Sequence, residues 1–144
     1  MARIRSKKVN YYGHTFDSVA EGEFYLSLRS DPNVQDIILQ PQYTLIGAFA
    51  VPCGKCNGTG KVKSRKTANE VQCRSCKGAG ESKRRPWTYK ADFLVIYKDG
   101  RQEVIDVKGG FTDAKFPYVK KMFEYKTGQE LIVWKKTRTG WKRG

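Results

Sequence analysis

Four cysteines, arranged as two Cys-x-x-Cys pairs, restrict the fold of this chain more than any other feature. The pairs are Cys53 with Cys56 and Cys73 with Cys76, and sixteen residues separate them. This spacing is typical of four-thiolate zinc sites, in which each pair forms a tight knuckle and two knuckles complete a tetrahedron. It predicts a Zn²⁺ site with all four cysteines as ligands. Because four protein thiolates leave no open coordination position, the predicted role of the zinc is structural.

Glycines after each pair support the zinc interpretation. The segments 57–60 (Asn-Gly-Thr-Gly) and 77–80 (Lys-Gly-Ala-Gly) permit the positive φ angles that a knuckle requires. The repeated Cys-x-x-Cys-x-Gly-x-Gly pattern resembles the cysteine-rich zinc modules of DnaJ-type chaperones, with two of the usual four repeats. The alternatives are two disulfides in an exported protein, or a redox dithiol. The first eight residues lack the apolar segment of a signal peptide, and a redox site does not need two matched pairs.

The composition changes abruptly around the cysteines. Residues 53–86 are rich in Gly, Lys, Arg and Ser, whereas apolar alternation precedes Pro52 and returns at Trp87. We therefore predict a core of about 110 residues formed by 1–52 and 87–144, with residues 1–10 as a basic arm. Residues 53–86 form an inserted zinc module, which has too few apolar side chains to fold without its metal.

The charge is large and unevenly distributed. The chain has 28 Lys and Arg against 14 Asp and Glu, a net charge of +14. Residues 53–90 hold eleven of the bases and two acids, while residues 11–52 hold one base and five acids. Such a surplus predicts a polyanionic partner, by default nucleic acid, although a solvated basic surface is the alternative. No apolar run is long enough to span a membrane, so we expect a cytoplasmic protein.

The pattern outside the cysteine segment predicts an α/β core. A hairpin is expected over 9–16, around Tyr12-Gly13, followed by a helix that Ser18 caps and that runs to about Arg29. A short apolar stretch covers 34–39, and the remaining predictions are strands over 43–51, 89–97, 103–107 and 131–134, a helix over 115–126, and a basic tail over 135–144.

The type of turn in the hairpin over 89–107 determines whether its two acids, Asp92 and Asp106, face each other. A two-residue loop at Asp99-Gly100 would turn Asp92 away from Asp106. A three-residue loop over 98–100, with Gly100 in the left-handed position of a bulge, sets Asp92 directly opposite Asp106. We predict the second register.

A site follows from this register. Two convergent carboxylates suit a hard divalent cation, Mg²⁺ or Mn²⁺. Lys108 lies two residues after Asp106, hence on the same face of its strand, where it could activate water or stabilise phosphate charge. The alternative is a surface hairpin with ordinary charges.

These residues resemble the signature of the PD-(D/E)XK nuclease superfamily. The order is a helix with Glu21, a strand with Asp92, and a strand with Asp106-Val107-Lys108-Gly109. The segments 13–18 (Gly-His-Thr-Phe-Asp-Ser) and 39–41 (Leu-Gln-Pro) resemble a phage-encoded, Holliday-junction-resolvase-like branch. Ala91 stands where many members have proline, and the cysteine segment lies outside the resemblance.

The resemblance implies a fold, an activity and site residues. The fold is a restriction-endonuclease-like α/β core, in which a mixed sheet is flanked by helices. The activity is Mg²⁺-dependent DNA hydrolysis at branched structures such as Holliday junctions, by a homodimer in the host cytoplasm if the protein is phage-encoded. The implied catalytic residues are Glu21, Asp92, Asp106 and Lys108, with Gln40 as an auxiliary residue and Asp92 and Asp106 as magnesium ligands. Glu21 is also the expected N3 residue of a capping box.

Basic residues are the predicted DNA contacts. They are Lys61, Lys63, Arg65, Lys66, Lys83, Arg84 and Arg85 in the zinc module, and Lys115, Lys120 and Lys121 on the second helix. Tyr11, Tyr12, Trp87, Trp134 and Trp141 could stack on bases, but core packing is the commoner role. Glu23, Glu103 and the single histidine, His14, are expected outside the site.

Two other functions remain open from the sequence. A non-catalytic zinc-containing nucleic-acid-binding protein would account for the charge and the cysteines, with the acids as ordinary surface charges. A chaperone-like zinc protein would account for the cysteines, but for neither the acids nor the charge.

Overall fold

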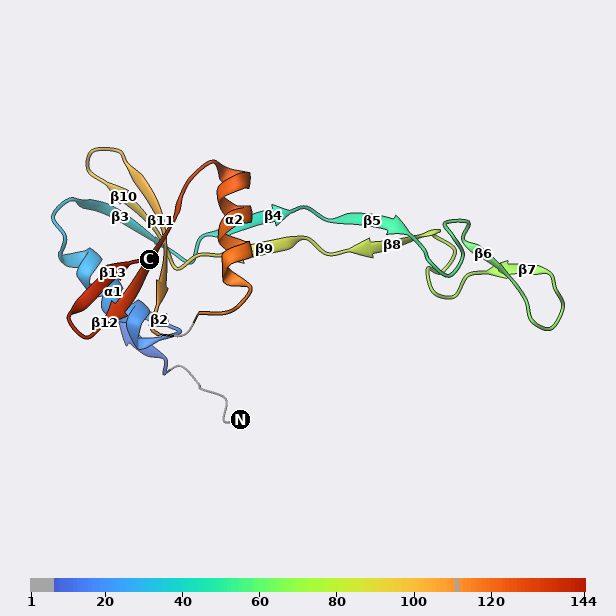
Figure 1. Ribbon diagram of the computed structural model, residues 1–144, viewed down its shortest axis with the longest axis horizontal. Coiled ribbons are helices and arrows are strands. Elements are labelled where there is room, and N and C mark those ends of the chain that lie inside the picture. Colours follow the sequence, from blue (N-terminus) through green and yellow to red (C-terminus); the bar gives the residue numbers. More distant parts are fainter. Residues whose placement is uncertain (1–6, 111) are drawn as a thin grey trace. The chain divides into compact units, whose positions relative to one another are not determined.

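The computed structural model describes residues 7–110 and 112–144 and divides the chain into two units (Figure 1). Unit 1 comprises residues 1–43 and 89–144, and unit 2 comprises residues 44–88. Most of the predicted basic arm, residues 1–6, lies outside the described residues, and Val9 and Asn10 belong to the first strand. The chain is a mixed α/β protein, rich in strands and with two helices in its described part.

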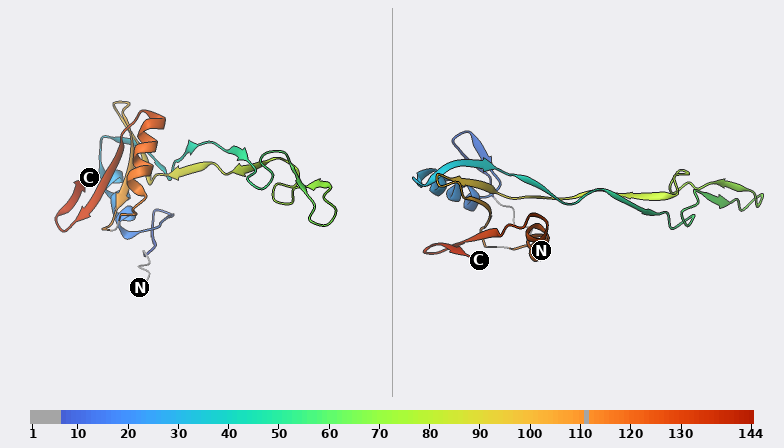
Figure 2. Two further views of the ribbon diagram at one scale, coloured as in Figure 1. Left: turned by 45° about the vertical axis from the view of Figure 1, so that its right-hand side comes forward. Right: turned by 90° about the horizontal axis from the view of Figure 1, so that it is seen from above.

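Unit 1 is built on a five-stranded sheet in the order β13-β12-β11-β10-β3. Only β11 and β12 are parallel, and helix α2 makes the crossover between them. Helix α2 contacts β12, and the left view of Figure 2 shows the orange helix next to the red strand. The elements are β3 (Val34–Leu39), β10 (Phe93–Tyr97), β11 (Gln102–Lys108), α2 (Phe116–Thr127), β12 (Leu131–Thr137) and β13 (Gly140–Arg143).

Helix α1 (Val19–Ser30) begins as its sequence predicts. The Ser18 hydroxyl accepts a hydrogen bond from the backbone N–H of Glu21, 3.1 Å away, and so satisfies one free donor of the first turn. Gly22 allows the hairpin of β1 (Val9–Tyr11) and β2 (His14–Phe16) to pack closely, because a Cβ there would lie 2.6 Å from the Val9 side chain. Tyr12 and Gly13 both have positive φ, as the tight hairpin turn requires.

The main core lies between α1, the β1–β2 hairpin and one face of the sheet. Phe24, Tyr25 and Phe93 are buried, and the ring of Phe93 contacts those of Phe24 and Tyr25. Trp134 and Trp141 pack against the same cluster, and Phe24 contacts both rings. The two tryptophans therefore have the packing role that the sequence favoured over base stacking.

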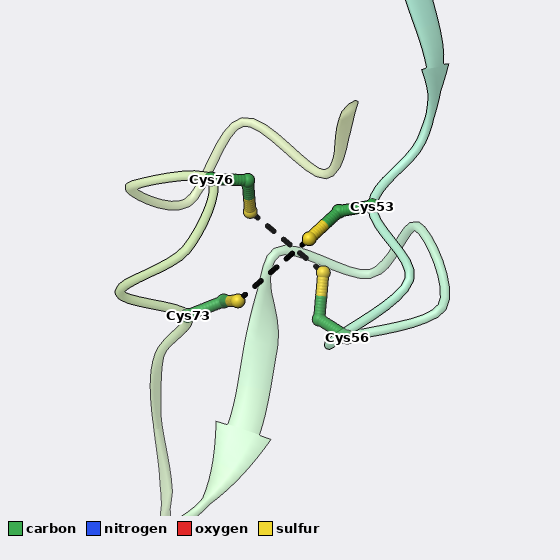
Figure 3. A group of neighbouring side chains, drawn as sticks. All are labelled: Cys53, Cys56, Cys73 and Cys76. Atoms are coloured by element: carbon green, nitrogen blue, oxygen red, sulfur yellow. Dashed lines mark hydrogen bonds between the residues drawn. The ribbon is translucent and has the colours of Figure 1, made fainter. Parts of the chain in front are cut away.

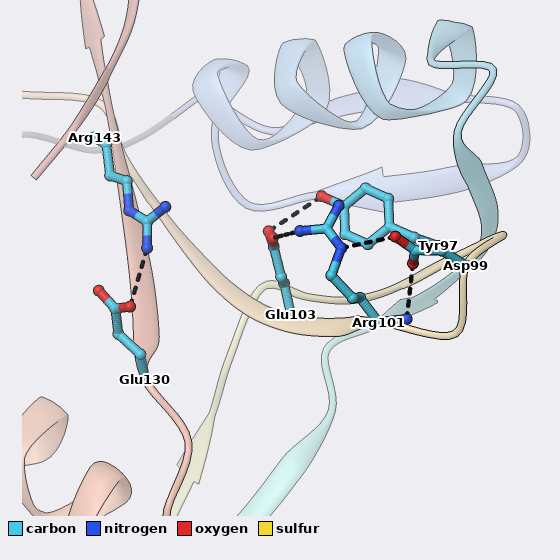
Figure 4. Close-up of polar contacts among 6 residues, drawn as sticks. All are labelled: Tyr97, Asp99, Arg101, Glu103, Glu130 and Arg143. Carbon is cyan, nitrogen blue, oxygen red and sulfur yellow. Dashed lines mark hydrogen bonds and ion pairs between the residues drawn. The ribbon is translucent and has the colours of Figure 1, made fainter.

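The β10–β11 hairpin has the predicted register. Phe93 pairs with Ile105, and Tyr97 donates a backbone hydrogen bond to Arg101 across a three-residue loop, with Gly100 at φ +90°. Figure 4 shows side chains that brace this turn: Arg101 contacts both Asp99 and Glu103, and the Tyr97 hydroxyl donates to Glu103. The predicted loop and register of the hairpin are confirmed, and the ladder ends at Phe93 and Ile105, so Asp92 lies just outside β10.

Three predicted elements differ from the structure. The strand over 89–97 is two strands, β9 (Trp87–Lys90) and β10, because β9 pairs with β4 (Gln42–Ile46) whereas β10 pairs with β3 and β11. The strand over 43–51 is also two, β4 and β5 (Phe49–Pro52), interrupted at Gly47. The basic tail over 135–144 is not irregular, because it ends β12 and then pairs with it as β13. A predicted strand is divided where its pairing partner changes, and apolar alternation in the sequence does not show where that happens.

Unit 2 consists of paired strands and the cysteine knuckles. β5 pairs with β8 (Glu81–Arg84), and β6 (Lys61–Lys63) pairs with β7 (Glu70–Gln72). The knuckles lie between these two strand pairs along the chain. No helix in the described part of the chain is long and apolar enough to cross a membrane.

Candidate functional site

A cavity of about 320 Å³ in unit 1 gathers most of the predicted catalytic residues. It lies where the ends of β9 and β11 meet the first turns of α1 and α2. Four carboxylates and three lysines contribute to its wall. The lining residues are Glu21, Tyr89, Lys90, Asp92, Asp106, Val107, Lys108, Asp113, Lys115, Phe116 and Val119.

Asp92 and Asp106 are fixed by the sheet and by their own hydrogen bonds. The backbone N–H of Asp92 donates to the carbonyl of Ile105 at 3.1 Å, although Ile105 is paired with Phe93 in the β10–β11 ladder. One Asp92 carboxylate oxygen, Oδ2, accepts from the backbone N–H of Val107 at 2.7 Å. Asp106 is 5% exposed, and its Oδ2 accepts from the Tyr89 hydroxyl. The two acids are therefore held in place before any ligand binds.

Lys108 and Glu21 complete the group from two different elements. The Lys108 ammonium lies 2.8 Å from Asp106 Oδ1 and 3.9 Å from the centre of the Phe116 ring. Glu21 comes from the first turn of α1, where the Ser18 cap fixes the backbone. The end of β11 lies close to this turn, because a Cβ on Gly109 would approach Ala20 to 3.3 Å. Glu21 therefore combines the position of a capping residue with a place in the cavity wall.

Burial and like charges disfavour ionisation of two of the acids, Asp92 and Glu21. Desolvation, followed by the charges of Asp106 and Glu21, raises the pKa of Asp92 to about 8. Desolvation, followed by the charge of Asp17, raises the pKa of Glu21. Burial and the Asp106 charge also raise the pKa of Tyr89, so its hydroxyl remains a proton donor. The charge of Lys108 acts in the opposite direction on the pKa of Asp92 but does not offset burial and the like charges.

The donor set fits a hard divalent cation. Asp106 Oδ1 is buried and has no hydrogen-bond donor in the described structure, because the nearby Lys108 ammonium is not in hydrogen-bonding geometry. An oxygen without a donor, next to a second carboxylate, is suited to Mg²⁺ or Mn²⁺, which take oxygen ligands and retain waters. The carboxylates of the cavity are less closely grouped around a possible metal position than the four cysteines are. Within residues 7–110 and 112–144, the four cysteines are the one group of possible ligands whose donor atoms all lie within 4.8 Å of one another.

Other predicted residues lie outside the cavity wall. Gln40 has a positive φ, and its backbone N–H donates to the Asp92 carbonyl at 3.0 Å, but its side chain is exposed and does not line the cavity. Glu23 forms an ion pair with Lys136, and Glu103 accepts from the Tyr97 hydroxyl. His14 packs edge-on against Tyr25. All three lie outside the cavity wall, and Glu103, expected to be solvated, instead contacts Tyr97 and Arg101.

Sequence reasoning missed several residues of the wall. Tyr89, Lys90, Asp113, Phe116 and Val119 all line the cavity. Lys90 precedes Asp92 by two residues, so same-face spacing was a usable signal for it. Asp113 accepts a hydrogen bond from the backbone N–H of Lys115 just before α2. An Asp that bonds to the backbone two residues ahead is typical of a turn, so the sequence contained a signal for it. Nothing local indicated Tyr89, because its role depends on Asp106, seventeen residues away.

The four cysteines form a compact cluster in unit 2 (Figure 3). Cys53 Sγ lies 4.0 Å from Cys73 Sγ, and Cys56 Sγ lies 3.7 Å from Cys76 Sγ. None of the four is in a disulfide. A tetrahedron of sulfurs with metal–sulfur bonds of about 2.3 Å has edges of about 3.8 Å. The cysteines can therefore hold a metal ion without rearrangement.

The two knuckles are near-copies of each other. Gly60 N–H donates to Cys56 Sγ at 3.2 Å, and Gly80 N–H donates to Cys76 Sγ at 3.3 Å. Backbone N–H groups of Cys56 and Lys55 lower the pKa of Cys53 to about 6, which favours the thiolate that a metal binds.

Glycine is required where the knuckles meet. The backbone N–H of Cys53 donates to the Gly80 carbonyl at 3.0 Å, and that of Cys73 donates to the Gly60 carbonyl at 2.8 Å. A Cβ at Gly60 would lie 2.5 Å from the Gly78 carbonyl oxygen, and both glycines have positive φ. The close backbone contact thus explains the repeated Gly-x-Gly sequence.

The predicted phosphate contacts are mostly free surface residues. All seven basic residues predicted in the cysteine segment are exposed, as is Lys121 on α2. Lys115 lines the cavity. Lys120 is only partly exposed and pairs with Glu124 at 3.0 Å, so it is less available than Lys121.

Comparison with known proteins identifies one family. A family model described as "Protein of unknown function (DUF1064)" matches residues 1–142, nearly the entire chain. No curated protein and no solved structure matches the chain.

Proposed function

We propose that this chain, which belongs to the DUF1064 family, is a metal-dependent nuclease that hydrolyses phosphodiester bonds in DNA. One observation carries the proposal: Asp92, Asp106 and Lys108 line the wall of one cavity, with the Lys108 ammonium 2.8 Å from Asp106 Oδ1. The net charge of +14 supports a polyanionic substrate.

A divalent cation would be held by Asp92 and Asp106, with Glu21 as a further acid in the same wall. Mg²⁺ or Mn²⁺ supplies Lewis acidity toward a phosphate and neutralises its charge. Asp106 Oδ1 accepts no hydrogen bond, but it lies 2.8 Å from the Lys108 ammonium, beside which a bound cation would have to fit. Asp92 Oδ2 is already occupied by the Val107 N–H, which leaves its other oxygen for the cation.

Lys108 has the position of a group that acts on substrate. Its ammonium is held between Asp106 and the ring of Phe116, and its side chain is 19% exposed. From the cavity wall it can donate a hydrogen bond to a phosphate oxygen or orient an attacking water. The Tyr89 hydroxyl donates to the other oxygen of Asp106, Oδ2, and keeps that carboxylate in one orientation.

The finer parts of the proposal rest on the resemblance to PD-(D/E)XK nucleases. They are a restriction-endonuclease-like core, a preference for branched DNA and a homodimer that makes two cuts. The mixed sheet with α2 as a crossover between parallel strands is compatible with such a core. The metal of the cysteine cluster is proposed to be zinc in a structural role, since four thiolates leave no position for substrate.

The test is cleavage of a panel of duplex, fork and four-way-junction DNA with Mg²⁺ or Mn²⁺. Wild type should nick at least one substrate, and Asp92→Asn and Lys108→Ala should each lower the rate at least 100-fold while DNA affinity changes little. Glu130→Gln is the matched control, because Glu130 is an exposed acid that pairs with Arg143 outside the cavity (Figure 4). DNA binding without cleavage of any substrate would instead support a non-catalytic zinc-containing nucleic-acid-binding protein.

A further inference from the structure

Two tyrosines on α2 are unusually exposed. Tyr125 is 86% exposed and Tyr118 is 72% exposed, the highest values among large apolar side chains in the part of the chain that the structure describes. Neither ring has an aromatic or cationic partner among the described contacts. Packing within the chain therefore does not explain why these positions are aromatic.

Helical spacing places both rings on one face together with a lysine. Tyr118, Lys121 and Tyr125 follow one another at i, i+3 and i+7, and Lys121 is also exposed. The opposite face, with Phe116, Val119 and Phe123, lines the cavity or packs into unit 1. The exposed face, hereafter the tyrosine ridge (Tyr118, Lys121, Tyr125), is thus the side of α2 that the core does not use.

The charge around the ridge favours an anionic partner. Glu124, the only acid of α2, is paired with Lys120 and accepts the Leu131 backbone N–H, so it does not oppose the lysines. Lys115 lies at the start of α2 and lines the cavity. Positive charge therefore extends from the cavity wall to the ridge.

We propose that the tyrosine ridge binds a single-stranded segment of DNA that leads to the cavity, an inference that rests on the proposed nuclease function. Unpaired bases stack on Tyr118 and Tyr125, and Lys115 and Lys121 contact the phosphates. The two tyrosines are about 10 Å apart along the helix axis. At a rise of about 3.4 Å per stacked nucleotide, this distance corresponds to about three nucleotides. Duplex DNA cannot make the same contacts, because its base faces are covered by their neighbours.

The experiment measures binding rather than cleavage, without added divalent cation. Fluorescence anisotropy compares a labelled oligothymidylate, an abasic oligonucleotide of the same length and a short duplex. Wild type should bind oligothymidylate more tightly than the abasic strand. The Tyr118→Ala/Tyr125→Ala variant should bind oligothymidylate at least about fivefold more weakly, and should lose the preference for bases. Its duplex affinity should stay within about twofold of wild type.

The matched variant is Tyr118→Phe/Tyr125→Phe, which keeps both rings and should bind like wild type. Because the side chains are exposed, both variants should fold, and a thermal melt checks this. Equal oligothymidylate affinity for wild type and the alanine variant would overturn the proposal. An equal loss of duplex affinity in the alanine variant would also overturn it. So would a loss of oligothymidylate affinity in the phenylalanine variant equal to that in the alanine variant. Since no outcome depends on cleavage, the ridge and the nuclease proposal can fail separately.

Discussion

The hydroxyl of Tyr89 donates a hydrogen bond to Asp106 Oδ2, although the two residues belong to different strand pairs. Tyr89 lies on β9, which pairs with β4, whereas Asp106 lies on β11 in the five-stranded sheet. The bond leaves the second oxygen of Asp106, Oδ1, without a hydrogen bond and 2.8 Å from the Lys108 ammonium. Tyr89 therefore determines which oxygen of Asp106 is available to a ligand.

Tyr89→Phe should weaken Mg²⁺ binding with a smaller effect on the maximal rate. Loss of a hydrogen bond that orients a metal ligand typically costs about 10- to 100-fold in metal affinity. Calorimetry gives the Mg²⁺ affinity directly, and the Mg²⁺ dependence of cleavage gives it independently. Tyr97→Phe is the control, because the Tyr97 hydroxyl also donates to a carboxylate, Glu103, but away from the cavity. Unchanged Mg²⁺ affinity in Tyr89→Phe would show that Tyr89 serves packing alone.

Asp92→Asn should stabilise the protein at pH 8 when no Mg²⁺ is added. The pKa of Asp92 is raised to about 8 in the folded state, so the folded state holds its proton more tightly than the unfolded state does. Between about pH 4 and pH 8 this difference makes the free energy of unfolding fall as the pH rises. Asp92→Asn removes the cost of ionising this side chain, so its free energy of unfolding should exceed that of wild type by about 1–2 kcal/mol at pH 8. The difference should shrink toward pH 5.

Urea unfolding of wild type and variant at the two pH values measures this effect. Asp36→Asn is the control, because Asp36 is exposed on β3. The free energy of unfolding of this variant should stay within about 0.5 kcal/mol of wild type. A wild-type protein as stable as Asp92→Asn at pH 8 would contradict the electrostatic penalty.

The isolated protein should contain about one zinc per chain, and Cys73→Ser should lose it. Unit 2 lacks a large apolar core of its own, so loss of the metal should unfold its knuckles. Elemental analysis measures the zinc, and amide exchange measures protection in residues 44–88. Ser75→Ala, between the second pair of cysteines, is the control. Zinc-free wild-type protein, or two disulfides found by mass spectrometry, would refute the metal site.

Replacing Lys83, Arg84 and Arg85 together by alanine should flatten the salt dependence of DNA binding. Phe49 pairs with Arg84 and Ala50 with Lys83, so the two basic side chains point to opposite faces of the β5–β8 ribbon. Each lost phosphate contact lowers the slope of log K against log salt by about 0.9 on duplex DNA. A salt titration of wild type and the triple variant compares the slopes. Equal slopes would mean that these residues do not contact phosphates, and unit 2 would then be assigned to protein contacts or to stability.

Local features of the sequence determined the parts of the protein that depend on near neighbours along the chain. The Cys-x-x-Cys-x-Gly-x-Gly repeats predicted a cluster that the structure contains, because each knuckle closes within eight residues. Ser18 predicted the start of α1, and Gly100 predicted the three-residue loop and the register of the β10–β11 hairpin. In each case one residue type satisfies a steric or hydrogen-bonding requirement of the turn or helix end itself.

Only the tertiary structure decided which distant groups meet at the cavity. The break between β9 and β10 arises because each strand pairs with a different partner, and apolar alternation carries no information about partners. Tyr89 and Phe116 reach Asp106 and Lys108 only after the strands and α2 have packed. Gln40 matched a sequence motif, yet its side chain lies outside the cavity wall, because its positive φ is set by the chain turn beside Asp92. The spacing of residues specifies local geometry, but burial and the pairing of charges depend on which elements pack together.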